Sequence, residues 1–270
     1  MNILYTSDLH SRQKWYQWIL KQAPNYDLIC IAGDLLDMFS DKNLLEQLYE
    51  LYFWCQKMEK TGVPLALCSG NHDFAEKMLE HGDVSQAKQS VLKDEAFVNI
   101  FTGEGSYLNR LPGVICADQS NHIFKNQLLI SSCPYSFYDE RVEGTTRKLL
   151  YDAFALKQKH QIPWIILHHD PPEGAGISMA EHHIDSGSTS FGEWVRNLKP
   201  DITLSGHLHE APLVHGSCVD KVGKSFCFNC GHDSTASIPS YVELKLGKNR
   251  IDYSWAFKGK AREKKSLKVN

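Results

Sequence analysis

Three short apolar runs, each followed at once by polar residues, most constrain how this chain can fold. They span residues 2–7, 27–32 and 64–68, and segments with helical spacing of apolar side chains separate them. Because these runs are apolar throughout, both faces of each strand are expected to be buried, as in parallel sheets that are covered on both sides. The alternation of strands and helices therefore predicts βαβ units at the N-terminus of an α/β protein.

The segments between and after these runs predict the other elements. Apolar side chains recur at helical spacing before Pro24, and Asp41 is predicted to cap a helix that runs to about Lys60. The remaining expected elements are short strands and turns over 97–134, a helix over 139–160, a strand over 164–167, a helix over 191–198, a strand over 202–205, and antiparallel strands up to residue 257.

The chain shows no internal repeat and no low-complexity linker, which favours a single domain over residues 1–257. Its 270 residues suffice to bury a full hydrophobic core. Residues 258–270 carry six Lys or Arg against one Glu. We expect this basic C-terminal tail to be a frayed, solvated terminus rather than an anion-binding segment.

Composition and charge argue against several classes of protein. The chain is 42% hydrophobic and 23% charged, and its formal net charge of −3 gives no overall attraction to nucleic acid or acidic membranes. No apolar run approaches the ~20 residues that a membrane helix needs. The chemically important Asp8 leaves no room for a signal peptide before it, so we expect a cytoplasmic protein without a membrane partner.

The eight cysteines are scattered, mostly within apolar runs. This usage fits small buried side chains in a reducing compartment better than a disulfide framework. Cys227 and Cys230 have ligand-like spacing, but no second pair completes a zinc site, so a chance pair in a strand is the better interpretation.

Five of the expected strands end in side chains that can bind metals. Ligands of open α/β sheets bind outside the carboxyl ends of the strands, so these side chains are expected to converge on one site. Residues two apart point to the same side where a strand opens into a loop. The five segments are Asp8-x-His10, Gly33-Asp34, Gly70-Asn71-His72-Asp73, His168-His169 and Gly206-His207-x-His209.

The types of these side chains indicate which ions they would hold. Oxygen donors mixed with imidazoles, without a thiolate, suit Mn²⁺, iron, Zn²⁺, Co²⁺ or Ni²⁺. Seven candidate ligands are too many for one ion but enough for two ions that share a carboxylate. Two cations ~3.5–4 Å apart can clamp a phosphoryl group and generate hydroxide near neutral pH. We therefore expect two divalent metal ions, such as manganese, iron or zinc, as cofactors.

The five segments, in this order, resemble the calcineurin-like metallophosphoesterase family. The resemblance spans Asp8 to His209, about three quarters of the chain. Any single segment would be a weak signal, whereas the ordered set is specific. The resemblance implies an α/β fold with a central sandwich of two mixed sheets flanked by helices, into which the N-terminal βαβ units fit.

The same resemblance implies which side chains hold each ion. The implied ligands are Asp8, His10 and His209 for one ion; Asn71, His207 and one histidine of the 168/169 pair for the other; and Asp34 as a bridge between them. Members of the family often show His-x-Pro-Pro after the fourth of these strands. His169, followed by Asp170 and two prolines, matches that motif, so His169 is favoured over His168.

Two residues of the third segment are expected to act in catalysis without binding metal. The resemblance implies that His72 protonates the leaving group or steadies the transition state, and that Asp73 orients His72 from outside the metal shell. A hydroxide bridging both ions would attack phosphorus in line with the departing alcohol. His182 and His183 match no segment of the family and are expected to be surface residues.

Differences from other branches of the family narrow the substrate. Protein Ser/Thr phosphatases carry Arg-Gly shortly after the second segment and Gly-Asn-His-Glu in the third, whereas this chain has Leu35 to Met38 and then Asp73. The lipid A precursor diphosphatases have Arg where His72 stands. Small phosphodiesterases are the nearest in size and motif, so a small phosphate ester, above all a phosphodiester, is the expected substrate.

Two other functions stay open. Some members of the family keep the fold, lose ligands and serve as interaction scaffolds, but every segment here is intact. Nucleases of the family that act on DNA or RNA carry additional domains, whereas this chain has only a short basic tail, so a nucleic acid partner is not favoured. Salt-dependent binding to DNA would support the nuclease.

Overall fold

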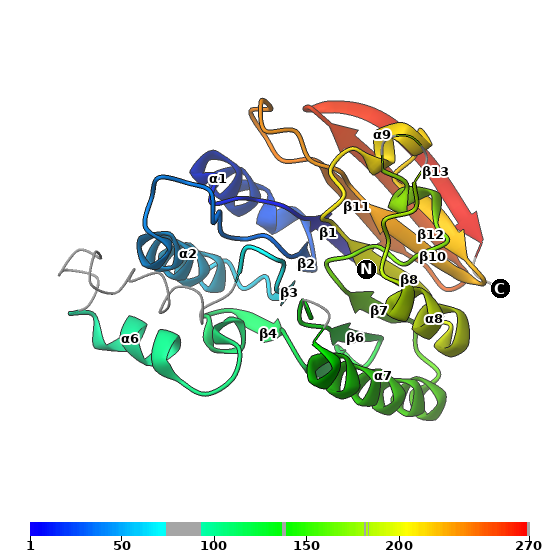
Figure 1. The fold of residues 1–270 in the computed structure, drawn as a ribbon, viewed down its shortest axis with the longest axis horizontal. Coiled ribbons are helices and arrows are strands. Elements are labelled where there is room, and N and C mark those ends of the chain that lie inside the picture. The colour runs from blue at the N-terminus through cyan, green and yellow to red at the C-terminus, as the bar shows by residue number, and fades with distance from the viewer. Residues whose placement is uncertain (74–92, 137–138, 181, 183, 269–270) are drawn as a thin grey trace.

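Two β-sheets pack face to face, and helices cover the outer face of each sheet (Figure 1). The computed structural model describes residues 1–73, 93–136, 139–180, 182 and 184–268. The expected α/β fold, a sandwich of two mixed sheets flanked by helices, is confirmed.

The first sheet is mixed, and its described strands lie in the order β13-β12-β11-β1-β2-β3-β4. Neighbours from β1 to β4 run parallel, while β11, β12 and β13 add antiparallel pairs on the other side of β1. The strands are β1 (Asn2–Thr6), β2 (Leu28–Ala32), β3 (Leu65–Cys68), β4 (Val114–Cys116), β11 (Tyr241–Leu246), β12 (Arg250–Phe257) and β13 (Lys260–Lys268).

The second sheet has the order β5-β6-β7-β8-β10-β9 in the described chain. Its central strands β6, β7, β8 and β10 are parallel, and its two edge strands are antiparallel to their neighbours. The strands are β5 (Ser120–Phe124), β6 (Leu128–Ser132), β7 (Trp164–Leu167), β8 (Ile202–Ser205), β9 (Val219–Val222) and β10 (Ser225–Asn229).

The helices lie on the two outer faces, so the molecule has four layers. α1, α2 and α6 pack on the first sheet, and α7 and α8 pack on the second (Figure 1). Within the described chain no helix is both long and apolar enough to cross a membrane. The helices are α1 (Gln13–Gln22), α2 (Leu44–Glu59), α6 (Glu95–Thr102), α7 (Glu140–His160), α8 (Thr189–Leu198) and α9 (Ala211–His215).

The continuous apolar strands are buried on both faces, as their sequences predict. In β2, Ile29 and Ile31 belong to the cluster packed under the helices, whereas Leu28 and Cys30 belong to the cluster between the sheets. Burying a side chain of this size contributes roughly 1.5–3 kcal/mol. All eight cysteines are buried free thiols, which agrees with their expected use as small core residues.

Three local expectations are wrong. The N-cap of α2 is Asn43, not Asp41, because the Asn43 side chain accepts a hydrogen bond from Leu45 N at 3.0 Å. Strand β10 lies in the segment expected to be antiparallel, yet it pairs parallel with β8. Residues 260–268 do not fray but form β13, in which Leu267 pairs with Ile251 of β12.

Candidate metal centre

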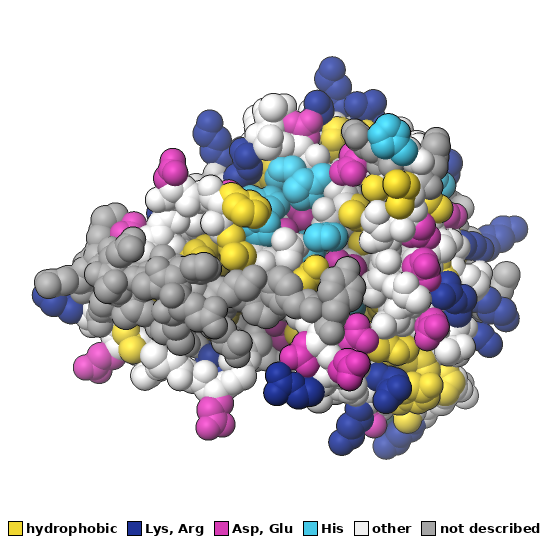
Figure 2. All heavy atoms as spheres, viewed as in Figure 1, with side chains coloured by type: hydrophobic (Ala, Val, Ile, Leu, Met, Phe, Trp, Pro, Cys, Tyr) yellow, Lys and Arg dark blue, Asp and Glu magenta, His cyan; other side chains and the backbone are white. Residues whose placement is uncertain are grey.

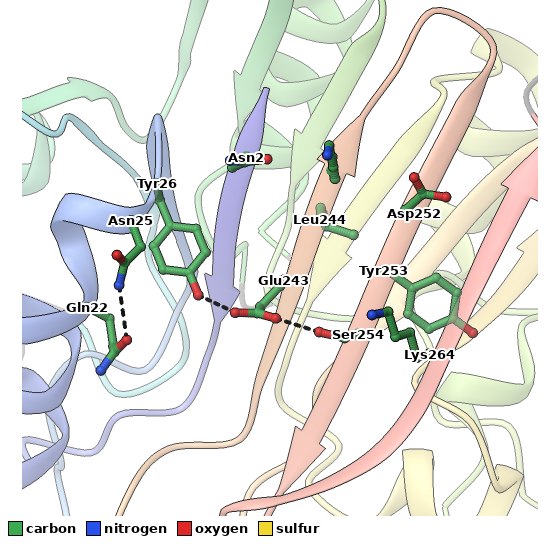
Figure 3. A pocket seen from close by; sticks show the side chains of 11 residues that line it. Asn2, Gln22, Asn25, Tyr26, Glu243, Leu244, Asp252, Tyr253, Ser254 and Lys264 are labelled. Carbon is green, nitrogen blue, oxygen red and sulfur yellow. Dashed lines mark hydrogen bonds between the residues drawn. The ribbon is translucent and has the colours of Figure 1, made fainter.

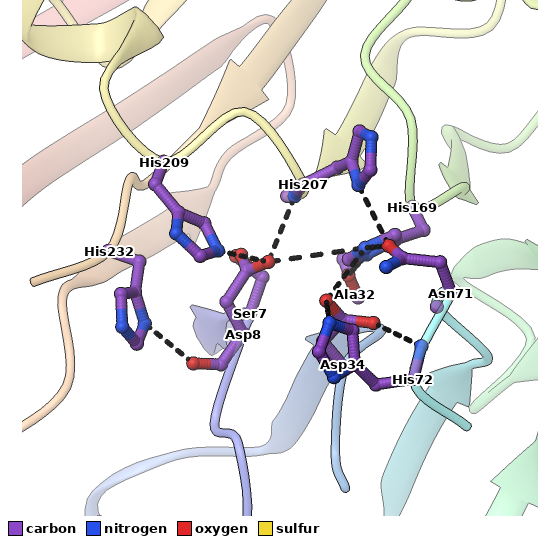
Figure 4. Close-up of polar contacts among 12 residues, drawn as sticks. Ser7, Asp8, Ala32, Asp34, Asn71, His72, His169, His207, His209 and His232 are labelled. Carbon is purple, nitrogen blue, oxygen red and sulfur yellow. Dashed lines mark hydrogen bonds and ion pairs between the residues drawn. The ribbon is translucent and has the colours of Figure 1, made fainter. Parts of the chain in front are cut away.

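The loops that follow six parallel strands, three from each sheet, meet at one edge of the sandwich. The expected ligands lie two or three residues beyond the strand ends: Asp8 after β1, Asp34 after β2, Asn71 after β3, His169 after β7 and His207 after β8. Figure 2 shows several histidine side chains gathered on this face, with acidic groups between them. The structure thus brings all seven predicted ligands together (Figure 4).

The backbone at this edge bends sharply. Asp8, Asp34 and His207 have positive φ angles of 54°, 52° and 66°, a conformation that is uncommon for residues with a side chain and that clusters at functional sites. Gly33 has φ 84°, and a Cβ added there would overlap the imidazole of His169. The glycine before Asp34 is therefore required by close packing across the two sheets.

Asp34 lies at the middle of the cluster and is only 2% exposed. Its Oδ2 lies 3.3 Å from His169 Nε2, 3.8 Å from His10 Nε2 and 3.9 Å from His72 Nε2. Burial raises the pKa of this carboxyl, but the neighbouring His169 outweighs that effect and the net pKa is lowered. This central place among three histidines is what a bridging carboxylate requires.

Asp8 forms a second fully buried acidic group. Its Oδ1 lies 3.3 Å from His209 Nε2 and 4.0 Å from His169 Nε2, and it accepts a hydrogen bond from His207 N at 3.0 Å. The hydroxyl of Ser7 donates to the other carboxylate oxygen. Burial raises the pKa of Asp8, but its hydrogen bond with His209 and the charges of nearby histidines lower it well below the usual value.

Asn71 presents its amide oxygen to two imidazoles from the other sheet. This Oδ1 lies 2.8 Å from His207 Nδ1 and 3.2 Å from His169 Nε2. The outer nitrogen of His207 lies 3.7 Å from Asp170 Oδ1. Asn71, His169 and His207 thus form a compact group on the opposite side of Asp34 from the group of Asp8, His10 and His209 (Figure 4).

The two adjacent histidines after β7 point in different directions. His169 is fully buried, its Nδ1 donates to the carbonyl of Ala32 at 2.7 Å, and its Nε2 faces the cluster. His168 instead stacks on Phe191 with 4.1 Å between ring centroids. Burial lowers the pKa of His169, but the charges of Asp34 and Asp8 prevail and raise it to about 10. The geometry favours His169, and its role as a ligand stays a prediction.

His72 is held in one tautomer by the backbone. The amide of Met38 donates to His72 Nδ1 at 3.0 Å, so the proton of the neutral ring lies on Nε2. That nitrogen lies on the side of Asp34, at 3.9 Å. His10, Asp34 and His72 also form a group whose ligand atoms lie within 4.8 Å of one another. The exposed ring of Phe39 covers His72, with 5.1 Å between ring centroids.

Asp73 does not orient His72 as expected. Among the described residues its carboxylate accepts hydrogen bonds from the backbone amides of Leu35, Leu36 and Gly70, at 3.2, 2.8 and 2.8 Å. Burial and the charge of Asp34 raise the pKa of Asp73 to about 7. The residue therefore ties together the loops after β2 and β3, and it acts on the site through their backbone.

The sequence analysis missed His232. This residue follows β10, its Nδ1 donates to the carbonyl of Asp8 at 2.8 Å, and its ring stacks on His209. Burial and the nearby His209 lower its pKa to about 4. The signal was present, because Gly231-His232 follows an apolar strand as in the other segments. It was overlooked because β10 was expected to be antiparallel, with its carboxyl end away from the site.

Other predicted surface residues and cavities lie apart from this centre. His182 is exposed, and His183 lies outside the described residues. A cavity of about 360 Å³ opens between β1, β11 and β12, where Glu243 accepts hydrogen bonds from Tyr26 and Ser254 (Figure 3). None of the candidate ligands lines it.

The donor set fits divalent cations. Within the described chain, every ion pair of Asp8 and Asp34 is with a histidine, so no Lys or Arg offsets these two buried charges. Buried carboxylates are costly unless cations or hydrogen bonds compensate them. Carboxylate, amide and imidazole donors that converge around Asp34 supply what two divalent ions need.

Comparisons with known proteins agree with this assignment. A family model described as calcineurin-like phosphoesterase matches residues 1–211. The smaller-named component SbcD of the nuclease SbcCD from Escherichia coli (strain K12) is 26% identical over 288 residues, which cover 91% of this chain and 66% of that protein. The chain thus spans slightly less than two thirds of the length of this relative.

Two solved structures share the fold. TT1561 of Thermus thermophilus superposes with a TM-score of 0.54 at 14% identity, covering 100% of this chain and 99% of that one. GAP50, the anchor in the inner membrane complex of Plasmodium, gives a TM-score of 0.60 at 12% identity, covering 100% and 89%. Because the family model matches well over half of the sequence, the chain belongs to the calcineurin-like phosphoesterase family, whose members are hydrolases that use divalent metal ions.

Proposed function

We propose that this protein hydrolyses phosphodiesters with the help of two divalent metal ions. The observation that carries the proposal is the pair of buried carboxylates, Asp8 and Asp34, compensated only by histidines within the described chain. Bound divalent cations would supply an activated water molecule and offset charge on the phosphoryl oxygens. Asp34 would bridge the two ions, and Asn71 and His207 would complete the second position.

The residues of the chain supply positioning and a proton. His72 carries its proton on Nε2, facing the site, because the Met38 amide occupies Nδ1. A proton at that atom can pass to the oxygen of the departing alcohol, which is the role of a general acid. Asp73 holds the loops that carry Asp34 and Asn71, so it fixes the distance between the two ion positions.

The first experiment compares substrate classes. Metal-stripped protein should not hydrolyse an aryl phosphodiester, and added Mn²⁺ should restore hydrolysis, with kcat/KM higher for diesters than for monoesters. Full activity in stripped protein would refute the role of the metals. A metal-loaded protein that hydrolyses no ester of the panel would instead indicate an interaction scaffold.

A second candidate function is a nuclease, which the similarity to the SbcCD nuclease over 91% of this chain favours. Single-stranded and duplex DNA therefore belong in the substrate panel. Cleavage of DNA that weakens steeply with added salt would support this function, since contacts with phosphates release counterions. Hydrolysis confined to small esters would exclude it.

The role of His72 gives a sharper test of the reaction. His72→Ala should keep both metals yet lose turnover by ~10²–10⁴, because it removes a general acid. The loss should be smallest for nitrophenolate leaving groups, which need little protonation, and largest for alkyl esters. A loss that is uniform across leaving groups would indicate electrostatic stabilisation, and loss of metal would make His72 a ligand.

A further inference from the structure

His232 lies where a further metal ligand could act, beside one half of the cluster. Its ring centroid lies 4.3 Å from that of His209 and 5.0 Å from that of His10 (Figure 4). Each of these three histidines offers a ring nitrogen, and the nitrogens lie within 4.8 Å of one another. The three come from loops after β1, β8 and β10, so the fold gathers them from both sheets.

The surroundings of His232 resemble those of a metal ligand. Metal-binding histidines usually donate their other ring N–H to a carbonyl or carboxylate, which fixes the tautomer. His232 Nδ1 donates to the carbonyl of Asp8 at 2.8 Å, just as His169 Nδ1 donates to that of Ala32 at 2.7 Å. With Nδ1 engaged, Nε2 is left as the donor atom of the neutral ring.

The loop that carries His232 is also fixed in place. The amide of His232 donates to the carbonyl of His209 at 3.2 Å, and Gly231 N donates to the side chain of Asn229 at 2.9 Å. The ring of Trp15 packs against His232 with 5.1 Å between centroids. These contacts hold the imidazole in position beside the cluster.

We propose that His232 is a third imidazole ligand of the ion held by Asp8, His10 and His209. The inference rests on the proposed metal-dependent function. It also implies a difference between the two positions, because the other has two imidazoles, His169 and His207, together with the amide oxygen of Asn71. Imidazole suits zinc and iron, whereas oxygen ligands suit manganese. His232 therefore raises the preference of its position for zinc over manganese.

Two substitutions separate binding of metal from support of the backbone. His232→Asn places an amide NH₂ near the position of Nδ1, so it can keep the hydrogen bond to Asp8 while removing Nε2. His232→Ala removes both functions. His160→Ala, at the exposed end of α7, is the matched control. All three proteins are compared with wild type by thermal unfolding before metal is measured.

The measurement is affinity for Zn²⁺ and Mn²⁺ by competition with a chelator, together with X-ray absorption of the zinc-loaded wild type. We expect His232→Asn to lose zinc affinity at one position by at least ~10-fold, with a smaller loss for manganese and none in His160→Ala. The absorption spectrum should require three imidazoles at one zinc and two at the other.

Three results would overturn the inference. Wild-type affinity for both ions in His232→Asn would leave only the backbone role, the more so if His232→Ala alone loses metal. Two imidazoles at each zinc in the wild type would do the same even if the variants fail to fold. A wild type that binds no metal at all would overturn the proposed function as well, so the two failures can be told apart.

Discussion

At the scale of single residues, the site depends on which nitrogen of each imidazole faces the cluster. Hydrogen bonds to backbone groups decide this: Ala32 O engages His169 Nδ1, and Met38 N engages His72 Nδ1. The first contact leaves a bare Nε2 in the neutral ring and the second leaves a protonated one. Two histidines of the same kind thereby receive opposite roles, one as ligand and one as proton donor.

The two histidines after β7 should differ sharply when replaced. His169→Ala removes an imidazole that faces Asp34 at 3.3 Å, so we expect metal affinity and kcat/KM to fall by at least ~100-fold. His168→Ala removes a ring that stacks on Phe191 and should reduce thermal stability while both metals stay bound. Metal analysis and kinetics of the two variants measure this, and the reverse order would contradict the assignment.

The raised pKa of His169 predicts how metal loading depends on pH. In the metal-free protein this pKa is raised to about 10, so over the whole range below it a metal must displace a proton. We expect the apparent metal affinity to keep rising from about pH 6 to about pH 9, by up to ~10-fold per unit for this proton. Titration with a chelator at each pH measures it. An affinity that levels off above the ordinary histidine pKa would show that no such proton is displaced.

At the scale of elements, Asp73 connects the loops that end β2 and β3. Asp73→Ala would leave three backbone amides without their acceptor, at a cost of roughly 1–3 kcal/mol for each that stays buried. We expect lower stability in denaturant and weaker metal binding together. The control is Asp139→Ala, which removes the solvent-accessible cap of α7 and should lower stability much less, without affecting metal. Normal stability with lost turnover would restore the direct role toward His72.

The sequence predicts the elements whose signals are local and fails where pairing is long-range. The strands over 164–167 and 202–205 are found as expected, because short apolar runs between turns define them. The cap of α2 was misplaced by two residues, since Asp41 and Asn43 are equally good cap types and only the folded loop selects one. The direction of β10 depends on its pairing with β8, which no local pattern encodes, and His232 was overlooked for that reason.

At the scale of the whole molecule, β13 covers the last edge of the first sheet. Its lysine-rich sequence predicted a solvated tail, but lysines are also typical of exposed edge strands, where they oppose pairing with other chains. Removing residues 258–270 would expose the edge of β12 and uncover Leu267's partner, Ile251. We expect a lower melting temperature and aggregation, measured by thermal unfolding and light scattering. Removal of residues 269–270 alone is the control, and an unchanged melting temperature after the longer deletion would contradict the role of β13.

The position of the cluster between the sheets links binding to folding. Asp8 and Asp34 extend from the first sheet, while His169 and His207 extend from the second. An ion bound by both groups would act as a clamp across the sandwich, and a ligand that binds only the folded chain adds ~2.7 kcal/mol to its stability at about 100 times its Kd. The supply of metal in the cell would then govern how long each molecule survives unfolding and proteolysis, as well as how fast it turns over substrate.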